Sequence, residues 1–488
     1  MTELLLGIDL GTTSVKAGLF DERGRRVARF HRPLATNRPA ADRCEQKPED
    51  WIELIDAALS AFRAEVPNTP IAAGAVTSQV NTHVFVDRAG APLMPAIVWQ
   101  DTRAAKEAEE LDARLTEAEK IRWFGAPVPI DASHALARML WVARHRPDIW
   151  DRTAHVLLPK DYVLRRLTGA LATDPLSNVG LVGLNGRYVL EVLALVPGAA
   201  ERLPVIRGLT EIIGRTQGGV PIVNATMDGW IGLVGTGACR EQAFAYQSGT
   251  SEVLGAASSK VTGAPGIVVF PEAEGITLHA GPTQSGGASQ HWFCGVTGID
   301  IHDMVKLVEG SDRRRPAPLF LPQLAGERAP LWNAGLRGAF LGVGAEMQLG
   351  EFARGVYEGV ALSARHVLQA LEASCGLTAD EIYCSGGGFG SGPWGQIRAD
   401  VLGKPLKRLA VVEAGVVGAA CFAALAAGHA DSLAAAQAPF LRFDQTWLPD
   451  PSMRGLYDDL FGIYLDAITA NEAVGRRLTS TWEQVGRP

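Results

Sequence analysis

The chain has 488 residues, of which 47% are hydrophobic and 20% are charged, so it can fill large buried cores. A disordered protein would be poorer in apolar residues and more highly charged. The net charge of −7 is small for this length and gives no reason to expect nucleic acid as a partner. At about 150 residues per domain, the length predicts about two to three domains.

The six cysteines are widely spaced and contain no Cys-x-x-Cys pair, which argues against a disulfide scaffold or zinc module and suits a reducing compartment. The first apolar run stops at Asp9 and follows no basic leader. The uncharged stretch 414–428 is shorter than the roughly 20 residues that span a membrane, and it predicts a closely packed interior helix. We therefore expect a cytoplasmic protein without a membrane partner.

Strand-like and helix-like patterns alternate along the chain, which predicts an α/β fold. Residues 4–8 form an apolar run that ends at a glycine turn, and residues 15–20 continue as a second strand. Residues 210–219, interrupted by three glycines, are expected to be mostly loop, before a strand at 220–224 and a helix at Asp228. Further helices are expected at 50–64, 103–115 and 351–372.

One internal similarity links the two halves of the chain. The sequence Gly-Thr-Thr-Ser-Val at 11–15 resembles Gly-Thr-Ser-Glu-Val at 249–253. The spacing predicts two similar domains, each opening with a β-hairpin whose tip is Gly/Thr/Ser. Such a tip presents N–H groups and hydroxyls that can hold phosphate. Because Gly-Thr-Ser turns are common, a chance similarity stays open on these residues alone.

Two aspartates have both a structural and a functional interpretation. Asp9 ends a buried strand beside the first hairpin tip, where its carboxylate suits a Mg²⁺–nucleotide site or an ordinary Asx turn. Asp228 lies at a helix start, where a carboxylate can take part in chemistry or simply cap the helix. The residues by themselves leave both alternatives open.

Several catalytic motifs are absent, among them the P-loop, the zinc-protease helix, the nucleophile elbow and the protein-kinase set. One G-x-G-x-x-G pattern occurs at 390–395, inside a stretch with six glycines between Ser385 and Gly395. Its glycines do not follow the preceding strand as tightly as a dinucleotide fold requires. We interpret the stretch as a loop against which an adenine can lie, with an NAD-dependent oxidoreductase as the alternative.

The motifs together resemble the FGGY family of carbohydrate kinases, within the actin-like ATPase superfamily, over nearly the whole chain. Gly-Ile-Asp-Leu-Gly-Thr-Thr-Ser-Val-Lys at 7–16 resembles the family's opening. Further matches follow in the family's order, at 95–103, 158–169, 228–237, 248–251, 326–332, 355–360 and 385–388 with Trp394, Gln396, Ile397 and Asp400. The chain length and Leu-Pro-Lys-Asp-Tyr at 158–162 resemble the xylulokinase branch most.

The resemblance implies an α/β protein of two actin-like (ribonuclease-H-like) domains, 1–240 and 241–488, with ATP and a sugar in a central cleft. The first domain would hold the sugar site, the first phosphate loop and the catalytic aspartate. Asp228 would be the base that takes the proton from the sugar hydroxyl, and Asp9 and Asp228 are the candidate Mg²⁺ ligands. The residues implied for the nucleotide are Asp9, Gly11, Thr12, Thr13, Lys16, Gly249, Thr250, Gly387, Gly388, Ser391 and Gln396.

The implied sugar contacts differ from the family's usual ones. They are Gln79, Val80, Asn81, Trp99 and Asp228. The xylulokinase branch has Gly-Gln-Met-His-Gly and glycerol kinases have Asn-Gln-Arg-Glu-Thr where this chain has Ser-Gln-Val-Asn-Thr at 78–82. After Asp228 the chain has Gly-Trp, where Asn or Gln is usual.

We predict that the substrate is a ketopentose, D-xylulose or a close analogue such as a deoxyketose, phosphorylated to its 5-phosphate. A kinase for glycerol, a tetritol or an aldonate is the alternative. A nucleotide-binding relative without activity is a further alternative, against which the presence of both Asp9 and Asp228 speaks. The sequence leaves the oligomeric state open, a homodimer included.

Overall fold

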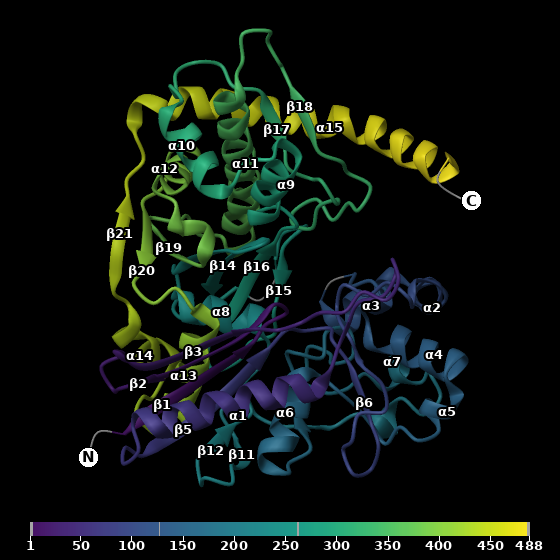
Figure 1. Ribbon diagram of the computed structural model, residues 1–488. Coiled ribbons are helices and arrows are strands. Elements are labelled where there is room, and N and C mark those ends of the chain that lie inside the picture. Colours follow the sequence, from purple (N-terminus) through teal and green to yellow (C-terminus); the bar gives the residue numbers. More distant parts are fainter. Residues whose placement is uncertain (1–2, 126, 261–262, 486–488) are drawn as a thin grey trace. The chain divides into compact units, whose positions relative to one another are not determined.

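The computed structural model describes residues 3–125, 127–260 and 263–485, which form two compact units. Unit 1 comprises the described residues of 1–235, 271–275 and 413–441, and unit 2 those of 236–270, 276–412 and 442–488. Each unit is built on one large mixed sheet with helices packed on it, so the predicted α/β class is confirmed (Figure 1). The predicted domain boundary at residue 240 stays a prediction.

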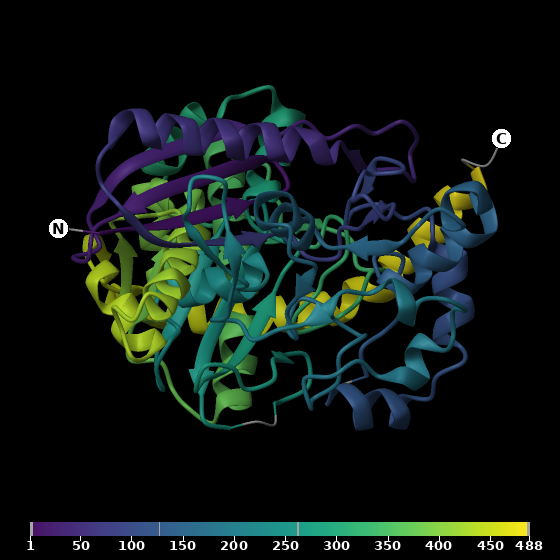
Figure 2. The same ribbon diagram turned by 90° about the horizontal axis from the view of Figure 1, so that it is seen from below.

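The large sheet of unit 1 has six strands in the order β11-β12-β5-β1-β2-β3. The pairs β3–β2 and β2–β1 are antiparallel, the pairs β1–β5 and β5–β12 are parallel, and the pair β12–β11 is antiparallel. The long helix α1 runs alongside these strands (Figure 2). The elements are β1 (Leu4–Leu10), β2 (Ser14–Phe20), β3 (Arg26–Pro33), β5 (Ile71–Ser78), β11 (Ile212–Arg215), β12 (Pro221–Val223), α1 (Pro48–Glu65), α6 (Pro159–Thr168), α8 (Asp228–Thr236) and α13 (Ala414–Ala426).

The two faces of this sheet carry different residues, because side chains alternate along a strand. The side chains of β1 that lie in the core with α1 and α6 are Leu4, Leu6, Ile8 and Leu10. Gly7 and Asp9 therefore face the opposite side, where α13 packs. A Cβ atom at Gly7 would lie 2.0 Å from the carbonyl oxygen of Val416, so only glycine allows α13 to approach β1 this closely. Asp9 thus shares a face of the sheet with α13.

A second apolar core of unit 1 includes Leu136, Met139 and Val192. The remaining elements of unit 1 are β4 (Glu45–Gln46), β6 (Val84–Val86), β7 (Ala96–Ile97), α2 (Ala105–Asp112), α3 (Glu117–Phe124), α4 (Ala135–His145), α5 (Pro147–Trp150), β8 (His155–Leu157), β9 (Ala172–Thr173), α7 (Leu190–Leu193), η1 (Ala200–Arg202), β10 (Val205–Ile206), α14 (Leu433–Gln437) and η3 (Ala438–Phe440).

Unit 2 repeats the pairing pattern of unit 1. Its sheet has the order β15-β16-β14-β13-β19-β20-β21, and from β16 onwards neighbours again pair antiparallel, antiparallel, parallel, parallel and antiparallel. The elements are β13 (Phe244–Ser248), β14 (Glu252–Ser258), β15 (Val268–Val269), β16 (Thr277–Pro282), α9 (Gly287–Thr297), α10 (Ile301–Gly310), β17 (Leu319–Leu321), β18 (Ala339–Leu341), α11 (Leu349–Cys375), β19 (Ile382–Ser385), η2 (Gly387–Gly390), α12 (Gly392–Leu402), β20 (Leu406–Leu409), β21 (Phe443–Trp447), η4 (Pro451–Met453) and α15 (Arg454–Val485).

Most of the predicted elements are present. The similar segments 11–15 and 249–253 both begin at the tip of an antiparallel hairpin, which confirms two similar units that each contain such a hairpin. The stretch 414–428 contains the buried helix α13, as predicted. The prediction that 210–219 is mostly loop is wrong over 212–215, because β11 pairs there with β12. No bilayer-spanning helix is found in the part of the chain that the structure describes.

Candidate active site

Asp9 lies in the middle of a group of polar residues on the α13 face of the unit 1 sheet. Lys16 is opposite Asp9 on β2, and Thr77 is opposite Asp9 on β5. Residues directly opposite on neighbouring strands project to the same face, so all three side chains share it. The first turn of α13 also approaches here, because a Cβ atom at Gly415 would lie 2.6 Å from Oδ2 of Asp9.

Asp228 is brought to this face by a short segment between β12 and α8. The hydroxyl of Thr77 donates a hydrogen bond to the carbonyl oxygen of Thr226, at 2.7 Å. Ala225, one residue earlier, is buried and has a left-handed backbone with φ of 55°, which turns the chain out of the sheet. Asp228 then begins α8 and accepts a hydrogen bond from the N–H of Gly229 at 2.8 Å. The predicted helix start at Asp228 is confirmed.

Burial and neighbouring charges shift the pKa values of both aspartates. Burial raises the pKa of Asp9, and the positive charge of Lys16 opposes this shift. Burial, and then the negative charge of Asp9, raise the pKa of Asp228 to about 7. Two carboxylates that repel each other on one partly buried surface favour a cation between or beside them.

A buried polar network supports the segment that leads to Asp228. Nζ of Lys160 donates a hydrogen bond to Oδ1 of Asp161 at 2.8 Å and lies 3.2 Å from Oδ2 of Asp174. The other oxygen of Asp174 accepts a hydrogen bond from the hydroxyl of Thr226 at 2.6 Å. All four side chains are buried. The Lys160–Asp174 pair therefore fixes the backbone two residues before Asp228.

The first predicted phosphate loop is joined to the predicted sugar residues by a ring of hydrogen bonds. The hydroxyl of Thr12 donates to Oε1 of Gln79 at 3.0 Å and accepts from the indole N–H of Trp99 at 2.9 Å. The amide of Gln46 donates to the carbonyl oxygen of Thr12 at 2.7 Å and accepts from Nε2 of Gln79 at 2.8 Å. The structure therefore brings Thr12, Gln79 and Trp99 together, while Thr13 at the tip is exposed.

Val80 and Asn81 follow β5 in a bend, and both are partly buried. Asn81 has a left-handed backbone with φ of 55°, a conformation that asparagine tolerates well. The buried guanidinium of Arg138 donates to the carbonyl oxygen of Asn81, and the side-chain amide of Asn81 donates to the hydroxyl of Ser133 at 3.2 Å. The orientation of Asn81 is thus held on both its backbone and its side chain.

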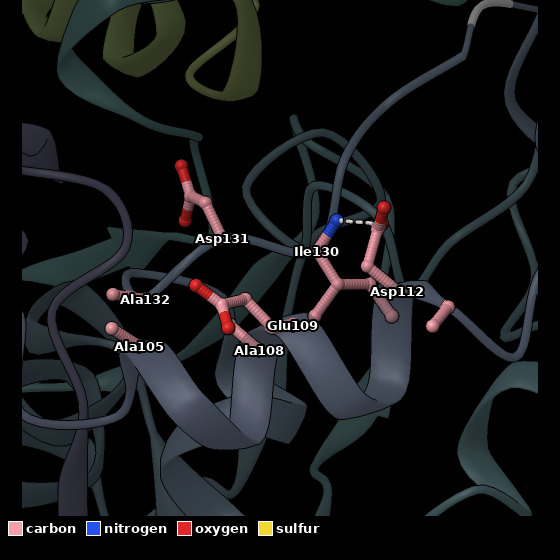
Figure 3. Close-up of a pocket in the computed structure, with 8 residues that line it drawn as sticks. Ala105, Ala108, Glu109, Asp112, Ile130, Asp131 and Ala132 are labelled. Carbon is pink, nitrogen blue, oxygen red and sulfur yellow. Dashed lines mark hydrogen bonds between the residues drawn. The ribbon is translucent and has the colours of Figure 1, made fainter. Parts of the chain in front are cut away.

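Unit 1 also has an open pocket of about 440 Å³, bordered by α2 and residues 130–132. Three of its lining side chains are carboxylates, from Glu109, Asp112 and Asp131 (Figure 3). Asp112 already accepts hydrogen bonds from the backbone N–H of Ile130 at 2.7 Å and from Lys120 at 2.6 Å. The pocket is lined by none of the residues predicted to bind sugar or nucleotide.

In unit 2, the second predicted phosphate loop is the tip of the β13–β14 hairpin. Gly249 and Thr250 are exposed there, and the N–H of Gly249 donates to the carbonyl oxygen of Ser251 at 2.9 Å. Helix α9 begins on this tip, because the N–H of Gly287 donates to the carbonyl oxygen of Gly249 at 2.9 Å. A Cβ atom at Gly287 would lie 2.6 Å from that oxygen, so a larger residue would separate the helix from the loop.

The predicted adenosine loop packs on the end of β13, next to the hairpin tip. A Cβ atom at Gly388 would lie 2.0 Å from Oγ of Ser248, whereas one at Gly387 would meet no atom within 4 Å. Ser391 stands immediately before α12, and the side-chain amide of Gln396 on α12 donates a hydrogen bond to Oδ1 of Asp400 at 2.9 Å. The predicted nucleotide residues of unit 2 therefore lie near the end of β13 and at the start of α12.

The same loop does not have the form of a dinucleotide-binding turn. The 3₁₀ turn η2 lies between the end of β19 and the start of α12, so the glycines at 390–395 do not directly follow a strand. The structure therefore gives no support to the NAD alternative.

Sequence reasoning missed the residues that hold these loops in place. Gln46 and Arg398 donate hydrogen bonds to the carbonyl oxygens of Thr12 and Gly388, and Asp174 accepts one from Thr226. Lys160 and Glu252 form buried ion pairs with Asp174 and Arg398. Of these five, Lys160 and Glu252 lie inside the motifs 158–169 and 249–253, and neither motif indicates a buried ion pair. Thr12 is 34 positions from Gln46, Thr226 is 52 from Asp174 and Arg398 is 146 from Glu252, so no local pattern could have identified these contacts.

Family models match most of the chain. The N-terminal domain of the FGGY family of carbohydrate kinases matches residues 4–235, and its C-terminal domain matches residues 244–427. A xylulose kinase of Escherichia coli (strain K12) is 30% identical over 93% of this chain and 96% of that protein. A xylulose kinase of Lactococcus lactis is 25% identical over 97% and 98% of the two chains, and a gluconokinase of Bacillus subtilis is 27% identical over 88% and 89%.

A solved structure agrees with these matches. The crystal structure of a xylulose kinase from Brucella ovis superposes with a TM-score of 0.88 at 27% identity, over 97% of this chain and 100% of that one. The predicted actin-like fold of two domains is thereby confirmed. The chain belongs to the FGGY family of carbohydrate kinases and is an ATP-dependent carbohydrate kinase.

Proposed function

We propose that this kinase phosphorylates a ketopentose, D-xylulose or a close analogue such as a deoxyketose, at its 5-hydroxyl. The observation that carries the proposal is the direct hydrogen bonding of Trp99 and Gln79 to Thr12. Residues expected to hold a sugar thereby contact the residue expected to hold phosphate. The names of the xylulose kinases that match nearly the full chain support a ketopentose.

In this proposal unit 1 supplies the sugar contacts Gln79, Val80, Asn81 and Trp99, together with the base Asp228. For the nucleotide, unit 1 supplies Asp9, Gly11, Thr12, Thr13 and Lys16, and unit 2 supplies Gly249, Thr250, Gly387, Gly388, Ser391 and Gln396. Phosphoryl transfer asks little covalent chemistry of a protein, so these residues act by positioning and by neutralising charge.

Asp228 would orient the attacking hydroxyl and accept its proton. Even with its pKa raised to about 7, the carboxylate is a far weaker base than a sugar alkoxide. It therefore cannot deprotonate the resting alcohol to a useful extent. The proton would move late, as the new P–O bond forms and the hydroxyl becomes acidic.

The donor set of unit 1 fits a magnesium ion that arrives with ATP. Asp9 would hold it, with Asp228 as the second candidate ligand, because Mg²⁺ favours one or two carboxylates and completes its shell with phosphate and water. Burial, and then the negative charge of Asp9, raise the pKa of Asp228, and a cation would offset the second of these effects. In the described residues no three His, Cys, Asp or Glu side chains form a metal cluster, and this mode of binding needs none. The bound ion would neutralise charge on the phosphates.

A screen for sugar-stimulated ADP release tests the proposal. It should include ketopentoses, deoxyketoses, glycerol, tetritols and aldonates, each at several concentrations. We expect a ketopentose or deoxyketose to give the highest kcat/KM. A higher value for gluconate would make the second candidate, suggested by the gluconokinase among the relatives, the correct one.

The residues after β5 give a sharper test of the sugar preference. Val80 is shorter than methionine, and an asparagine offers a different set of donors and acceptors from a neutral histidine. Changing Val80→Met together with Asn81→His should shift kcat/KM toward D-xylulose by about tenfold to a hundredfold, because one unpaired buried polar group has that effect on preference. Histidine also tolerates the left-handed backbone at position 81, so the bend should persist.

The readout is the ratio of kcat/KM for D-xylulose to that for the best substrate of the unchanged protein. Thermal melting of the double variant establishes that the fold is retained. An unchanged ranking with unchanged melting would show that selectivity resides elsewhere, for example at Trp99 or in residues 284–292.

A substitution in the predicted adenosine loop can test the nucleotide site without disturbing the fold. Gly387→Val adds a branched side chain where a Cβ atom would meet no other atom within 4 Å, so folding should be retained. We expect KM for ATP and the dissociation constant of ADP to rise by about tenfold or more, because the side chain occupies the surface against which the adenine ring lies. Gly310→Val, at another open glycine of unit 2, is the matched control. Equal ADP affinity in both variants, measured by calorimetry, would place the adenine elsewhere.

A further inference from the structure

A buried ion pair that the proposed reaction does not use joins helix α12 to strand β14. The guanidinium of Arg398 contacts the carboxylate of Glu252 at the start of β14, and the two side chains are 0% and 1% exposed. Two charges taken out of water need excellent geometry and further hydrogen bonds to be tolerated. The remaining partners of the pair therefore indicate what it holds together.

Those partners lie in the two loops predicted to bind the nucleotide. Nη1 of Arg398 donates to the carbonyl oxygen of Gly388 at 2.7 Å, and Nη2 donates to the hydroxyl of Ser248 at 2.8 Å. The same hydroxyl donates to Oε1 of Glu252 at 2.8 Å. One guanidinium thus connects the adenosine loop with both strands of the hairpin whose tip holds Gly249 and Thr250.

Aromatic rings fix the position of the guanidinium. Its central carbon lies 3.9 Å from the ring centre of Trp394, 4.6 Å from that of Phe389 and 5.4 Å from that of Tyr246. The hydroxyl of Tyr246 donates to Oε2 of Glu252 at 2.5 Å, so both oxygens of the carboxylate have partners. Arg398 cannot move without displacing rings packed in the core of unit 2.

We propose that Arg398, together with Glu252, is a positioning residue that holds the adenosine loop and the second phosphate loop in register and thereby sets the affinity for the nucleotide. The inference rests on the proposed function in one respect, namely that Gly249, Thr250, Gly387 and Gly388 bind one nucleotide. Neither Arg398 nor Glu252 is required to touch that nucleotide.

The chemistry of arginine explains why a charged pair occupies this position. Apolar residues of similar volume can stabilise a core as well as a buried ion pair does, so stability alone does not require charges here. An apolar pair has no donor for the carbonyl oxygen of Gly388 or the hydroxyl of Ser248. Lysine carries the charge but lacks the rigid fork of donors that reaches both acceptors at once.

The test compares Arg398→Met, Arg398→Lys and the double change Arg398→Met with Glu252→Gln. The double change removes both charges, so it leaves no uncompensated buried carboxylate and should recover much of the melting temperature lost in the single variant. Arg354→Met is the matched control, because Arg354 is another buried arginine of unit 2 and donates to carbonyl oxygens of residues 312 and 315 instead. The readouts are ADP dissociation constants by calorimetry, KM for ATP, KM for the sugar and thermal melting.

We expect all three Arg398 variants to bind ADP about tenfold to a hundredfold more weakly, because losing hydrogen bonds from a charged group typically has an effect of this size. KM for ATP should rise in parallel, KM for the sugar should change less than about twofold, and Arg354→Met should bind ADP normally despite a lower melting temperature. Normal ADP affinity in the double variant would overturn the inference. A loss of affinity that simply follows the melting temperature, Arg354→Met included, would also overturn it.

Arg398→Lys keeps the inference testable if Arg398→Met does not fold. Normal ADP affinity in a folded Arg398→Lys protein would overturn it, and weakened affinity would support it. The ADP measurement needs no sugar, so its result does not depend on which acceptor the kinase uses. If Gly387→Val weakens ADP binding and the Arg398 variants do not, the nucleotide site is correct and the positioning role is wrong. If no variant, Gly387→Val included, affects ADP binding, the nucleotide site itself is wrong.

Discussion

Replacing Asp228 by alanine should lower kcat by about 10²–10⁴-fold, the usual contribution of a general base. The change removes the group that receives the hydroxyl proton, while the partly buried position at the start of α8 should tolerate a small side chain. It also removes a buried carboxylate that the negative charge of Asp9 repels. Folding and ADP binding should therefore be nearly unchanged, as measured by thermal melting and calorimetry.

Asp300→Ala distinguishes this role from helix capping. Asp300 caps α10, and its side chain accepts a hydrogen bond from the N–H of Asp303 at 2.8 Å. Its loss should cost about 1 kcal/mol of stability and leave kcat unchanged. If Asp228→Ala behaves like Asp300→Ala, with sugar phosphorylation within about tenfold of the original rate, Asp228 is only a cap and the proposed base is wrong.

Replacing Asp9 by asparagine should reduce turnover by at least about a hundredfold, because a metal that neutralises transferring phosphate contributes several kcal/mol. Asparagine keeps the size of the side chain and its place on β1, so the packing of α13 against Gly7 should persist. The charge directed at the metal is lost. Higher Mg²⁺ concentrations should therefore be needed for half-maximal activity, while sugar affinity should change little.

The measurement is a magnesium titration of the initial rate at saturating ATP, with sugar affinity followed separately by tryptophan fluorescence or calorimetry. Lys16→Met is an informative companion, because Lys16 opposes the rise in the pKa of Asp9 and lies on the same face of the sheet. An Asp9→Asn protein with the original magnesium dependence and turnover would refute the metal role and leave Asp9 as an Asx turn.

Local sequence patterns predicted the parts of the site whose geometry is set by neighbouring residues. The β1–β2 and β13–β14 hairpins follow from two apolar runs separated by a Gly/Thr/Ser tip, and the start of α8 at Asp228 follows from a strand and a helix-compatible stretch. These features depend on side-chain alternation and on turn propensity, which act over a few residues. The sequence could therefore predict that Asp228 begins a helix and that Asp9 lies near the end of a strand, which continues one residue further to Leu10.

The prediction of a loop was wrong for one short strand, whose formation depends on pairing with its neighbour. Residues 212–215 begin with two isoleucines, which favour a strand, but the three glycines of 210–219 led to the prediction of a loop, and the segment forms β11 at the edge of the sheet. Backbone hydrogen bonds to β12 stabilise this strand, and strand formation depends more on such pairing than on intrinsic preference.

The sequence by itself determined the fold class, the two similar hairpins and the family, because ordered motifs and alternating patterns specify them. Only the tertiary structure decided which distant side chains support those motifs. Arg398 and Glu252 are 146 positions apart, Trp99 and Thr12 are 87 apart, and α13 packs on β1 from the other end of the chain. These contacts depend on how whole elements pack, and burial makes each partner indispensable to the other, since an unpaired buried polar group is costly.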